Sequence, residues 1–134
     1  MGETPMHIEY DRCSMYEAVA KTAAQYPDLT ALTFLGKKIP YAAMKKNIDR
    51  CASALSAIGV RENDRVTIAM PNCPQAVYVF YAVNRVGAIG NMIHPLSAEK
   101  EIEFYLNTSG STVAVTLDQF YGKFAAAMVR GIPP

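Results

Sequence analysis

Residues 59–95 read GVRENDRVTIAMPNCPQAVYVFYAVNRVGAIGNMIHP, and they carry the clearest pattern of strands and helices in the sequence. After a charged turn, Val66–Met70 is a short apolar run with little alternation, which is typical of a strand covered on both faces. Residues 76–86 are apolar nearly all round and predict a buried helix, with Pro74 in its first turn. Because Ala88–Ile93 then predicts a second strand, the stretch predicts a core βαβ unit.

A helix and a hairpin are predicted before this unit. Ser14 and Glu17 form a capping box, which predicts a helix over residues 14–26. The apolar face of that helix consists of Met15, Val19, Ala23 and Tyr26. Residues 30–41 predict a small hairpin, because β-prone residues flank the turn Gly36-Lys37-Lys38.

The next helix is predicted over residues 41–58, where apolar residues recur at a 3,4,3,4,3 spacing. Its core face consists of Tyr41, Met44, Ile48, Cys51, Leu55 and Ile58. The opposite, solvated face carries Lys45, Lys46, Asp49 and Arg50. Gly59 is the expected left-handed residue after this helix, and Val60 supplies the apolar contact that accompanies such a cap.

After the βαβ unit the chain continues as helix, strand and helix. The predicted N-caps of the last three helices are Asn72, Ser97 and Asp118. The helix after Ser97 runs to about Asn107, and Glu99 and Glu101 lie in its first turn, near the positive end of the helix dipole. Thr112–Leu117 predicts a strand, and Gly90 indicates close approach of another backbone. The face of the final helix consists of Phe120, Phe124 and Met128.

This alternation of strands and helices predicts an α/β fold, with a mostly parallel sheet flanked by helices in a flavodoxin-like, doubly wound arrangement. A length of 134 residues suffices for one domain, residues 1–134, with a core from about 14 to 130.

Composition excludes several classes of function. A formal net charge of +1 gives no basic patch for nucleic acid or for an anionic membrane. No run approaches the roughly 20 apolar residues of a membrane span, and the polar N-terminus is no signal peptide, so a cytoplasmic location is expected. Cys13, Cys51 and Cys73 are odd in number and far apart, which favours reduced core thiols over disulfides or a metal site.

Two loops that precede helices are candidate ligand contacts, because doubly wound folds bind ligands beyond the carboxyl ends of their strands. Pro71–Pro74 has lost two N–H donors to proline and holds no glycine, so we interpret it as a structural turn. His94–Ser97 could bring an imidazole to a pocket, but the other histidine is His7 and no carboxylate is placed to orient either ring. A structural role is favoured there too.

Thr108–Thr112 has the Ser/Thr and Gly composition that opens a phosphate-binding loop. However, Val113–Thr116 follows directly as a strand without further glycine or a lysine, so we interpret the segment as a helix-to-strand turn. No GxxxxGK[ST], GxGxxG, GxSxG or HExxH pattern occurs, and Glu99, Glu101 and Glu103 fit a solvated helix face. We therefore assign no catalytic, cofactor-binding or metal-binding residue.

The chain resembles the N-terminal part of the AMP-forming acyl-CoA synthetases, a superfamily shared with peptide-synthetase adenylation domains and beetle luciferases. The resemblance covers roughly residues 14 to 120 and is carried by the order and spacing of short matches. These are Ile39-Pro40-Tyr41, Gly59-Val60 with Asp64-Arg65-Val66, Met70-Pro71-Asn72, Tyr81-Ala82 through Gly87-Ala88 to Pro95, and Leu106-Asn107 with Ser109-Gly110 and Val113. Asn63 stands where the family usually has glycine, and asparagine tolerates the left-handed backbone that glycine would adopt.

The resemblance implies that the parent enzyme activates a fatty acid with ATP, forms an acyl adenylate and transfers the acyl group to coenzyme A with release of AMP. It also implies ATP, Mg²⁺ and coenzyme A as cofactors of that parent. The family's phosphate loop, magnesium motif, ribose-binding aspartate, hinge and C-terminal catalytic lysine have no counterpart here. We therefore expect an N-terminal scaffold fragment that is inactive alone, and Gly131–Pro134 as a truncation boundary.

The expected partners of such a fragment are the remainder of the same polypeptide and, in the parent, a long-chain or medium-chain carboxylic acid. An apolar edge left by truncation would favour a homodimer. The alternative is a standalone flavodoxin-like binding or interaction module without catalysis, which would lack the Gly/Ser/Thr-rich ligand loop usual after its first strand.

Overall fold

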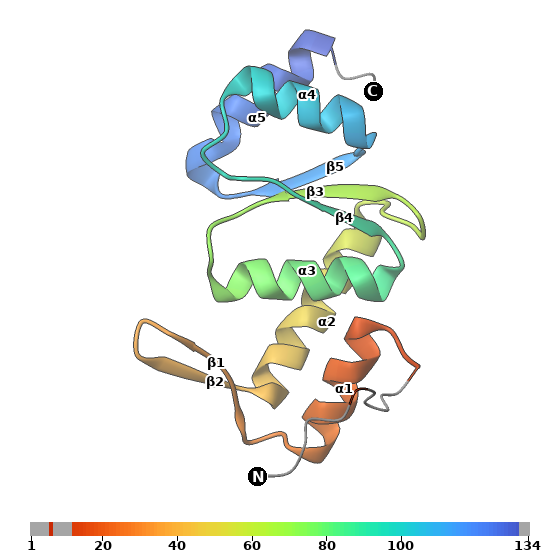
Figure 1. The fold of residues 1–134 in the computed structure, drawn as a ribbon, viewed down its shortest axis with the longest axis vertical. Coiled ribbons are helices and arrows are strands. Elements are labelled where there is room, and N and C mark those ends of the chain that lie inside the picture. Colours follow the sequence, from red (N-terminus) through yellow and green to blue (C-terminus); the bar gives the residue numbers. More distant parts are fainter. Residues whose placement is uncertain (1–5, 7–11, 132–134) are drawn as a thin grey trace.

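The structure is a computed structural model that describes residue 6 and residues 12–131. Helices and strands alternate along most of the chain (Figure 1). In chain order the elements are α1 (Met15–Gln25), β1 (Thr30–Phe34), β2 (Lys37–Pro40), α2 (Tyr41–Ala57), β3 (Arg65–Ala69), α3 (Pro74–Val86), β4 (Ile89–Met92), α4 (Glu99–Ser109), β5 (Val113–Thr116), the 3₁₀ turn η1 (Asp118–Phe120) and α5 (Tyr121–Gly131).

The central sheet is parallel, and its strand order is β4-β3-β5. The helices α2 and α3 lie on one side of it, and α4 and α5 lie on the other (Figure 1). Of the three strands of this sheet, β3 comes first in the sequence and lies between β4 and β5. This is the strand order at the start of a flavodoxin-like sheet. The predicted fold class, a parallel sheet flanked by helices, is confirmed.

Alternate residues of β3 supply two separate hydrophobic cores. Val66 and Ile68 are fully buried and belong to the larger core, which α2 and α3 complete. Ala69 belongs to the smaller core, together with Ile102, Leu106 and Phe124 of α4 and α5. Because successive side chains of a strand point to opposite faces, a strand buried on both faces explains the continuous apolar run of the sequence.

The helix α1 begins as predicted, since the Ser14 hydroxyl accepts a hydrogen bond of 3.1 Å from the Glu17 amide. Its predicted apolar face is wrong at both ends, because Met15 and Tyr26 are about half exposed, at 48% and 53%. Tyr16 packs against the larger core instead. The helix is therefore rotated relative to the stripe expected from spacing.

The helix α2 ends in the predicted glycine cap. Gly59 has a φ of +97°, and the Val60 amide donates to the Leu55 carbonyl at 3.0 Å. Met44, Ile48 and Leu55 are buried as predicted. Ile58 was expected in the core but is 64% exposed, because it lies at the cap, beyond the last helical residue.

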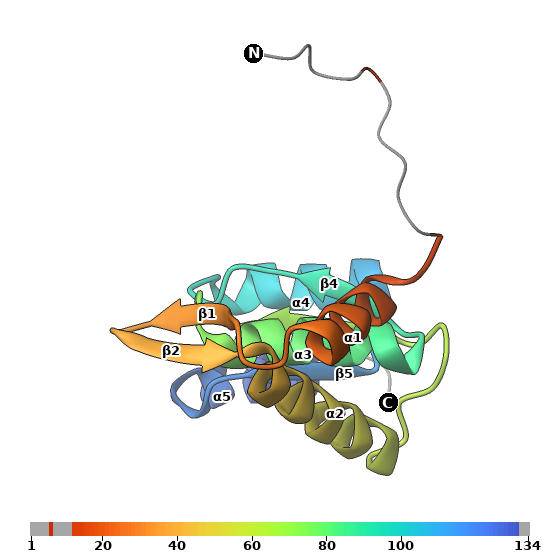
Figure 2. The same cartoon turned by 90° about the horizontal axis from the view of Figure 1, so that it is seen from below.

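The predicted hairpin is formed by β1 and β2, which pair antiparallel with Phe34 opposite Lys37. Its two-residue turn, Leu35–Gly36, has positive φ at both residues, +50° and +78°. Such values define the turn that matches the twist of a hairpin. The hairpin projects beyond the helices and the central sheet (Figure 2).

All three predicted side-chain caps of the later helices are wrong. The N-cap of α3 is Cys73 rather than Asn72, and the N-cap of α4 is Ala98 rather than Ser97; neither makes a side-chain hydrogen bond. The Ser97 hydroxyl instead donates to the His94 carbonyl at 2.7 Å. Asp118 begins the turn η1, which separates β5 from α5.

Smaller departures concern the ends of α4 and α5 and the environment of one glycine. The helix α4 runs to Ser109, two residues beyond the expected end. Phe124 is buried as expected, but Phe120 belongs to η1, and the side chain of Met128 lies outside the described residues. A Cβ on Gly90 would meet only side-chain atoms, at 3.8 Å, so the expected approach of another backbone is wrong.

The turn before β3 accommodates its asparagine as expected. Asn63 has a φ of +67°, and its amide donates to the Gly87 carbonyl at 2.9 Å. This hydrogen bond joins the turn to the end of α3. Among the described residues, no helix is long and apolar enough to cross a membrane.

Candidate functional site

The topology places the ligand crevice of such a sheet at the carboxyl ends of β3 and β5, where the chain leaves toward opposite faces. The edges of this crevice are the loop from Met70 to Cys73 and the start of η1 at Asp118. The hydroxyl of Thr116 donates to the Ala69 carbonyl at 2.9 Å and so joins the two strands. Because neither edge contains a glycine, this crevice has no glycine-rich cradle among the described residues.

The loop Pro71–Pro74 serves the start of α3. Pro74 occupies the first turn of the helix, where a missing N–H costs nothing, and the Ala76 amide donates to the Cys73 carbonyl at 3.1 Å. Two prolines leave few free donors at this helix N-terminus. The structural role of Pro71–Pro74 stays a prediction, which the proline positions and the Ala76–Cys73 hydrogen bond support.

The imidazole of His94 stabilises its own turn. Its Nδ1 accepts a hydrogen bond of 3.1 Å from the Leu96 amide, while the Ser97 hydroxyl donates to the His94 carbonyl. Because Nδ1 is an acceptor, the neutral ring carries its proton on Nε2. These contacts favour the structural interpretation of His94, and His7 lies outside the described residues.

The segment Thr108–Thr112 uses its backbone donors within the fold. The amides of Gly110 and Ser111 both donate to the Leu106 carbonyl, at 3.0 and 3.3 Å, and the Thr112 amide donates to the Arg65 carbonyl at 3.0 Å. Gly110 has a φ of +68° and ends α4. Donors bound in this way cannot cradle a phosphate, which supports the helix-to-strand interpretation.

A polar chain links this turn to the sheet. The hydroxyl of Ser111 lies 2.7 Å from that of Ser109 and 2.6 Å from that of the fully buried Thr67. The side-chain amide of Asn91 donates to the Thr67 hydroxyl at 3.1 Å. These hydrogen bonds satisfy the buried Thr67 hydroxyl and fix the turn. None of the four side chains titrates near neutral pH.

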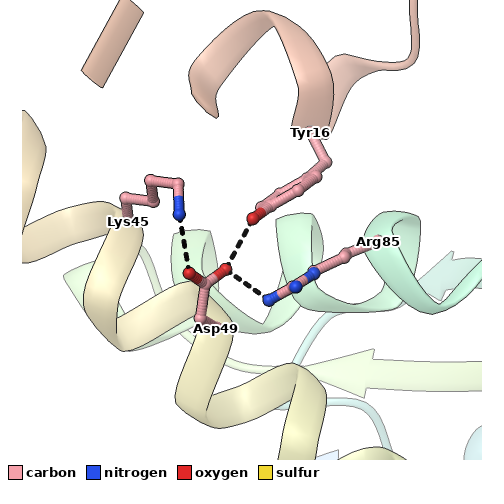
Figure 3. A network of polar contacts seen from close by, with 4 residues as sticks. All are labelled: Tyr16, Lys45, Asp49 and Arg85. Atoms are coloured by element: carbon pink, nitrogen blue, oxygen red, sulfur yellow. Dashed lines mark hydrogen bonds and ion pairs between the residues drawn. The ribbon is translucent and has the colours of Figure 1, made fainter. Parts of the chain in front are cut away.

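The densest charged cluster of the described residues surrounds Asp49 on α2 (Figure 3). Its Oδ1 accepts hydrogen bonds of 2.6 Å from the Tyr16 hydroxyl of α1 and from the Arg85 guanidinium of α3. Its Oδ2 accepts one of 2.9 Å from Lys45. The guanidinium also lies 5.0 Å from the centre of the Tyr16 ring. One carboxylate therefore connects three helices.

The cluster fixes the charge of its members. Burial alone would raise the pKa of Asp49, but hydrogen bonds from Tyr16 and Lys45 and the charge of Arg85 outweigh it and hold that pKa below the ordinary 3.8. Burial and the hydrogen bond to Asp49 raise the pKa of Tyr16 above 10.0. The hydrogen bond to Asp49 also raises the pKa of Lys45, against the opposing effect of burial. Each of these shifts moves a pKa further from neutral pH, which favours a structural role for the group over proton transfer.

The sequence pattern predicts a solvated helix face for Lys45 and Asp49, whereas in the structure both are partly buried and Asp49 binds side chains of α1 and α3. The spacing of Lys45 and Asp49 by four residues was a signal for their ion pair. No local signal pairs Asp49 with Tyr16 and Arg85, which are 33 and 36 residues away.

The described residues form an apolar concave surface between the hairpin and α3. It is a groove of about 470 Å³, and an adjoining groove of about 320 Å³ shares Leu32, Asn72, Ala76 and Val77 with it. Val77, Phe80 and Tyr81 of α3 line the larger groove, so this helix is open on one side and not buried all round as predicted. Among the described residues, no carboxylate, histidine or cysteine lines the larger groove, and its polar side chains are those of Tyr41, Asn72 and Tyr81.

The cysteines and the glutamates of α4 form no reactive or metal-binding group among the described residues. All three cysteines are free thiols, and burial raises the pKa of Cys51, which lowers its reactivity. Glu99 and Glu101 lie in the first turn of α4 as expected. Within residue 6 and residues 12–131, no group of three histidine, cysteine, aspartate or glutamate residues could hold a metal ion.

The model of the family described as AMP-binding enzyme matches residues 19–132. The chain belongs to this family. The resemblance predicted from the short matches is thereby confirmed.

Two of the relatives are both named long-chain-fatty-acid–CoA ligase. The chain is 31% identical over 122 residues to a long-chain-fatty-acid–CoA ligase of Bacillus subtilis, a match that covers 91% of this chain and 22% of the ligase. It is 34% identical over 95 residues to the long-chain-fatty-acid–CoA ligase FadD13 of Mycobacterium tuberculosis, covering 71% of this chain and 18% of that enzyme. The chain thus spans about a fifth of the length of these relatives.

Solved structures of adenylate-forming enzymes share the fold. The inhibitor-bound N-terminal domain of FACL13 from Mycobacterium tuberculosis superposes with a TM-score of 0.80 at 28% identity, over 90% of this chain and 31% of that domain. A fatty acyl CoA synthetase of the same organism gives 0.83 at 28% identity, over 90% and 24%. A benzoate CoA ligase of Burkholderia xenovorans also gives 0.83, at 15% identity over 90% and 25%, which shows the fold alone.

Proposed function

We propose that this chain is the N-terminal scaffold portion of an AMP-forming fatty-acid CoA ligase and is catalytically incomplete by itself. The observation that carries the proposal is the match to a long-chain-fatty-acid–CoA ligase over 91% of the chain, combined with a candidate phosphate turn whose amides are already bound. Family membership supports the reaction of the parent, and the occupied donors support the scaffold role.

In this proposal, the parent enzyme joins a long-chain or medium-chain fatty acid to ATP as an acyl adenylate and then transfers the acyl group to the thiol of coenzyme A. AMP is released. ATP and Mg²⁺ do not fit the described residues, because the turn at Gly110 has no free amide and no metal-binding cluster is present among them. These groups would therefore be held by other parts of the parent, and no step of the reaction is assigned to this chain.

The scaffold role has a physical basis in the grooves beside α3. Their lining includes Val77, Phe80 and Met92, and an open apolar surface of this kind is stabilised when another segment covers it. We propose the remainder of the same polypeptide as that partner. The covered groove would then support the parent's core, as a wall beside the substrate or pantetheine path.

Determining the reading frame beyond the codon for Pro134 and assaying the encoded protein tests this proposal. We expect a frame that continues into a glycine-rich, lysine-ended loop, and a protein that forms acyl-CoA and AMP from fatty acid, ATP and coenzyme A. Long-chain, medium-chain and aryl acids assayed side by side would define the acyl specificity. A continued frame whose protein activates none of these acids would overturn the proposal.

The alternative is a standalone flavodoxin-like binding or interaction module, with which the strand order β4-β3-β5 agrees as well as it does with the ligase portion. A stop codon directly after Pro134 in the natural gene would support it over the scaffold. For either function we propose a cytoplasmic location. We also propose that Ile89, an exposed apolar residue of the edge strand β4, allows a homodimer, which a monomeric light-scattering mass would exclude.

A further inference from the structure

The tip of the hairpin carries an apolar side chain that folding does not explain. Leu35 is 89% exposed and has a φ of +50°, a conformation that costs an L-residue free energy. Hairpin turns of this type favour asparagine, aspartate or glycine at this position. A single exposed apolar residue is ordinary on a protein surface, but one that also holds a strained backbone motivates the hypothesis of a contact outside the fold.

Two lysines flank this leucine. Lys37 and Lys38 are exposed, and neither makes an ion pair within the part of the chain that the structure describes. Lys37 pairs with Phe34, and Lys38 pairs with Thr33. Since successive side chains of a strand point to opposite faces, the two cations lie on opposite sides of the tip. The tip itself projects from the body of the molecule (Figure 2).

We propose that the hairpin tip binds an anionic lipid surface, with Leu35 entering the boundary between headgroups and acyl chains and with Lys37 and Lys38 contacting lipid phosphates. The net charge of +1 excludes a broad electrostatic footprint, but it does not exclude two local cations beside an apolar side chain. The inference goes beyond the proposed function and does not depend on it, because lipid binding needs no acyl activation.

The shape of the tip favours lipid over a protein partner. A stable protein interface buries about 800 Å² on each partner, which a convex two-residue turn cannot supply. A fluid bilayer requires no complementary pocket, and it combines apolar depth with phosphate charge. Leucine between two lysines matches both features.

Vesicle flotation of the 134-residue chain tests the proposal, with phosphatidylcholine vesicles that do or do not contain about 30% phosphatidylserine. The wild type should bind the anionic vesicles more strongly. Leu35→Asn should weaken this binding about tenfold, because the variant lacks the apolar side chain that enters the bilayer. The variant K37Q/K38Q should weaken it by a similar factor, through loss of two charges.

Matched controls separate the tip from general effects. Leu96→Asn removes an exposed leucine of the turn before α4, and K46Q/K100Q removes two exposed charges from α2 and α4. Both should bind as the wild type does. Misfolding cannot explain a loss in Leu35→Asn, because asparagine relieves the backbone and should leave the melting temperature unchanged or higher. Equal binding of wild type to both vesicles, full binding by Leu35→Asn, or equal weakening by the controls would overturn the proposal.

Discussion

The hydroxyl of Tyr16 donates a hydrogen bond of 2.6 Å to Oδ1 of Asp49 and so attaches α1 to α2 (Figure 3). The same oxygen accepts from Arg85 of α3. Since Met15 and Tyr26 at the ends of α1 are about half exposed, the helix relies on this polar contact together with the packing of Tyr16 and Val19. A second polar link is the hydrogen bond of 2.8 Å that the Tyr16 amide donates to Oδ1 of Asn84 on α3. The Asp49 cluster and this bond together connect the N-terminal helix to the rest of the fold.

Replacement of Asp49 by asparagine should destabilise the chain by about 1–3 kcal/mol, because hydrogen bonds to a charged acceptor are lost or weakened. The free energy of unfolding, measured by denaturant titration, checks this. Asp28→Asn is the matched control, since that exposed carboxylate makes no side-chain hydrogen bond or ion pair within the described residues. Equal stability of the two variants would contradict the role of the cluster.

The stability of the chain should fall at both extremes of pH because of this cluster. The fold lowers the pKa of Asp49, so its contribution is complete above 3.8 and is lost as pH falls below that value. The fold raises the pKa of Tyr16, so its contribution is complete below 10.0 and is lost as pH rises above that value. Unfolding titrations should show a flatter acid limb in Asp49→Asn and a flatter alkaline limb in Tyr16→Phe; unchanged limbs would refute this assignment.

Leu35→Asn should stabilise the chain by about 1 kcal/mol, because asparagine adopts positive φ more readily than leucine. Leu35→Ala provides the comparison, since it removes the apolar side chain without relieving the backbone. Thermal unfolding should rank the asparagine variant above both the alanine variant and the wild type. If the alanine variant gained as much, exposure rather than backbone strain would be the cause.

Asn63 should tolerate glycine but not valine. Its φ of +67° suits glycine at little cost, whereas a β-branched residue there is strained, with an expected loss of about 1–2 kcal/mol. Both variants keep the amide that donates to Gly87, so the comparison isolates the backbone conformation. Equal unfolding free energies of the two variants would show that the turn can change its conformation.

Much of the fold could be predicted because local signals and core packing agree. The run Val66–Met70 predicted a central strand, and Asn63, in the position of the family's glycine, was expected to accept a left-handed backbone; the structure confirms both. The caps at Asn72 and Ser97 failed because the choice between adjacent residues depends on the turn before the helix, which here is fixed by proline and by His94.

The contacts that connect distant elements could not be predicted from the sequence. The pairing of Asp49 with Tyr16 and Arg85 depends on how three helices cross, and no periodicity encodes that crossing. The open side of α3 could not be predicted either. An apolar helix predicts burial, but its sequence does not say which segment packs against each of its faces.

ATP–pyrophosphate exchange by the purified 134-residue chain tests the central claim most directly, because exchange reports acyl-adenylate formation without coenzyme A. The assay should include long-chain, medium-chain and aryl acids with Mg²⁺, and heat-denatured chain should define the background. A folded scaffold portion without the catalytic machinery predicts no exchange above that background with any acid. Exchange that depends on a carboxylic acid would contradict the account.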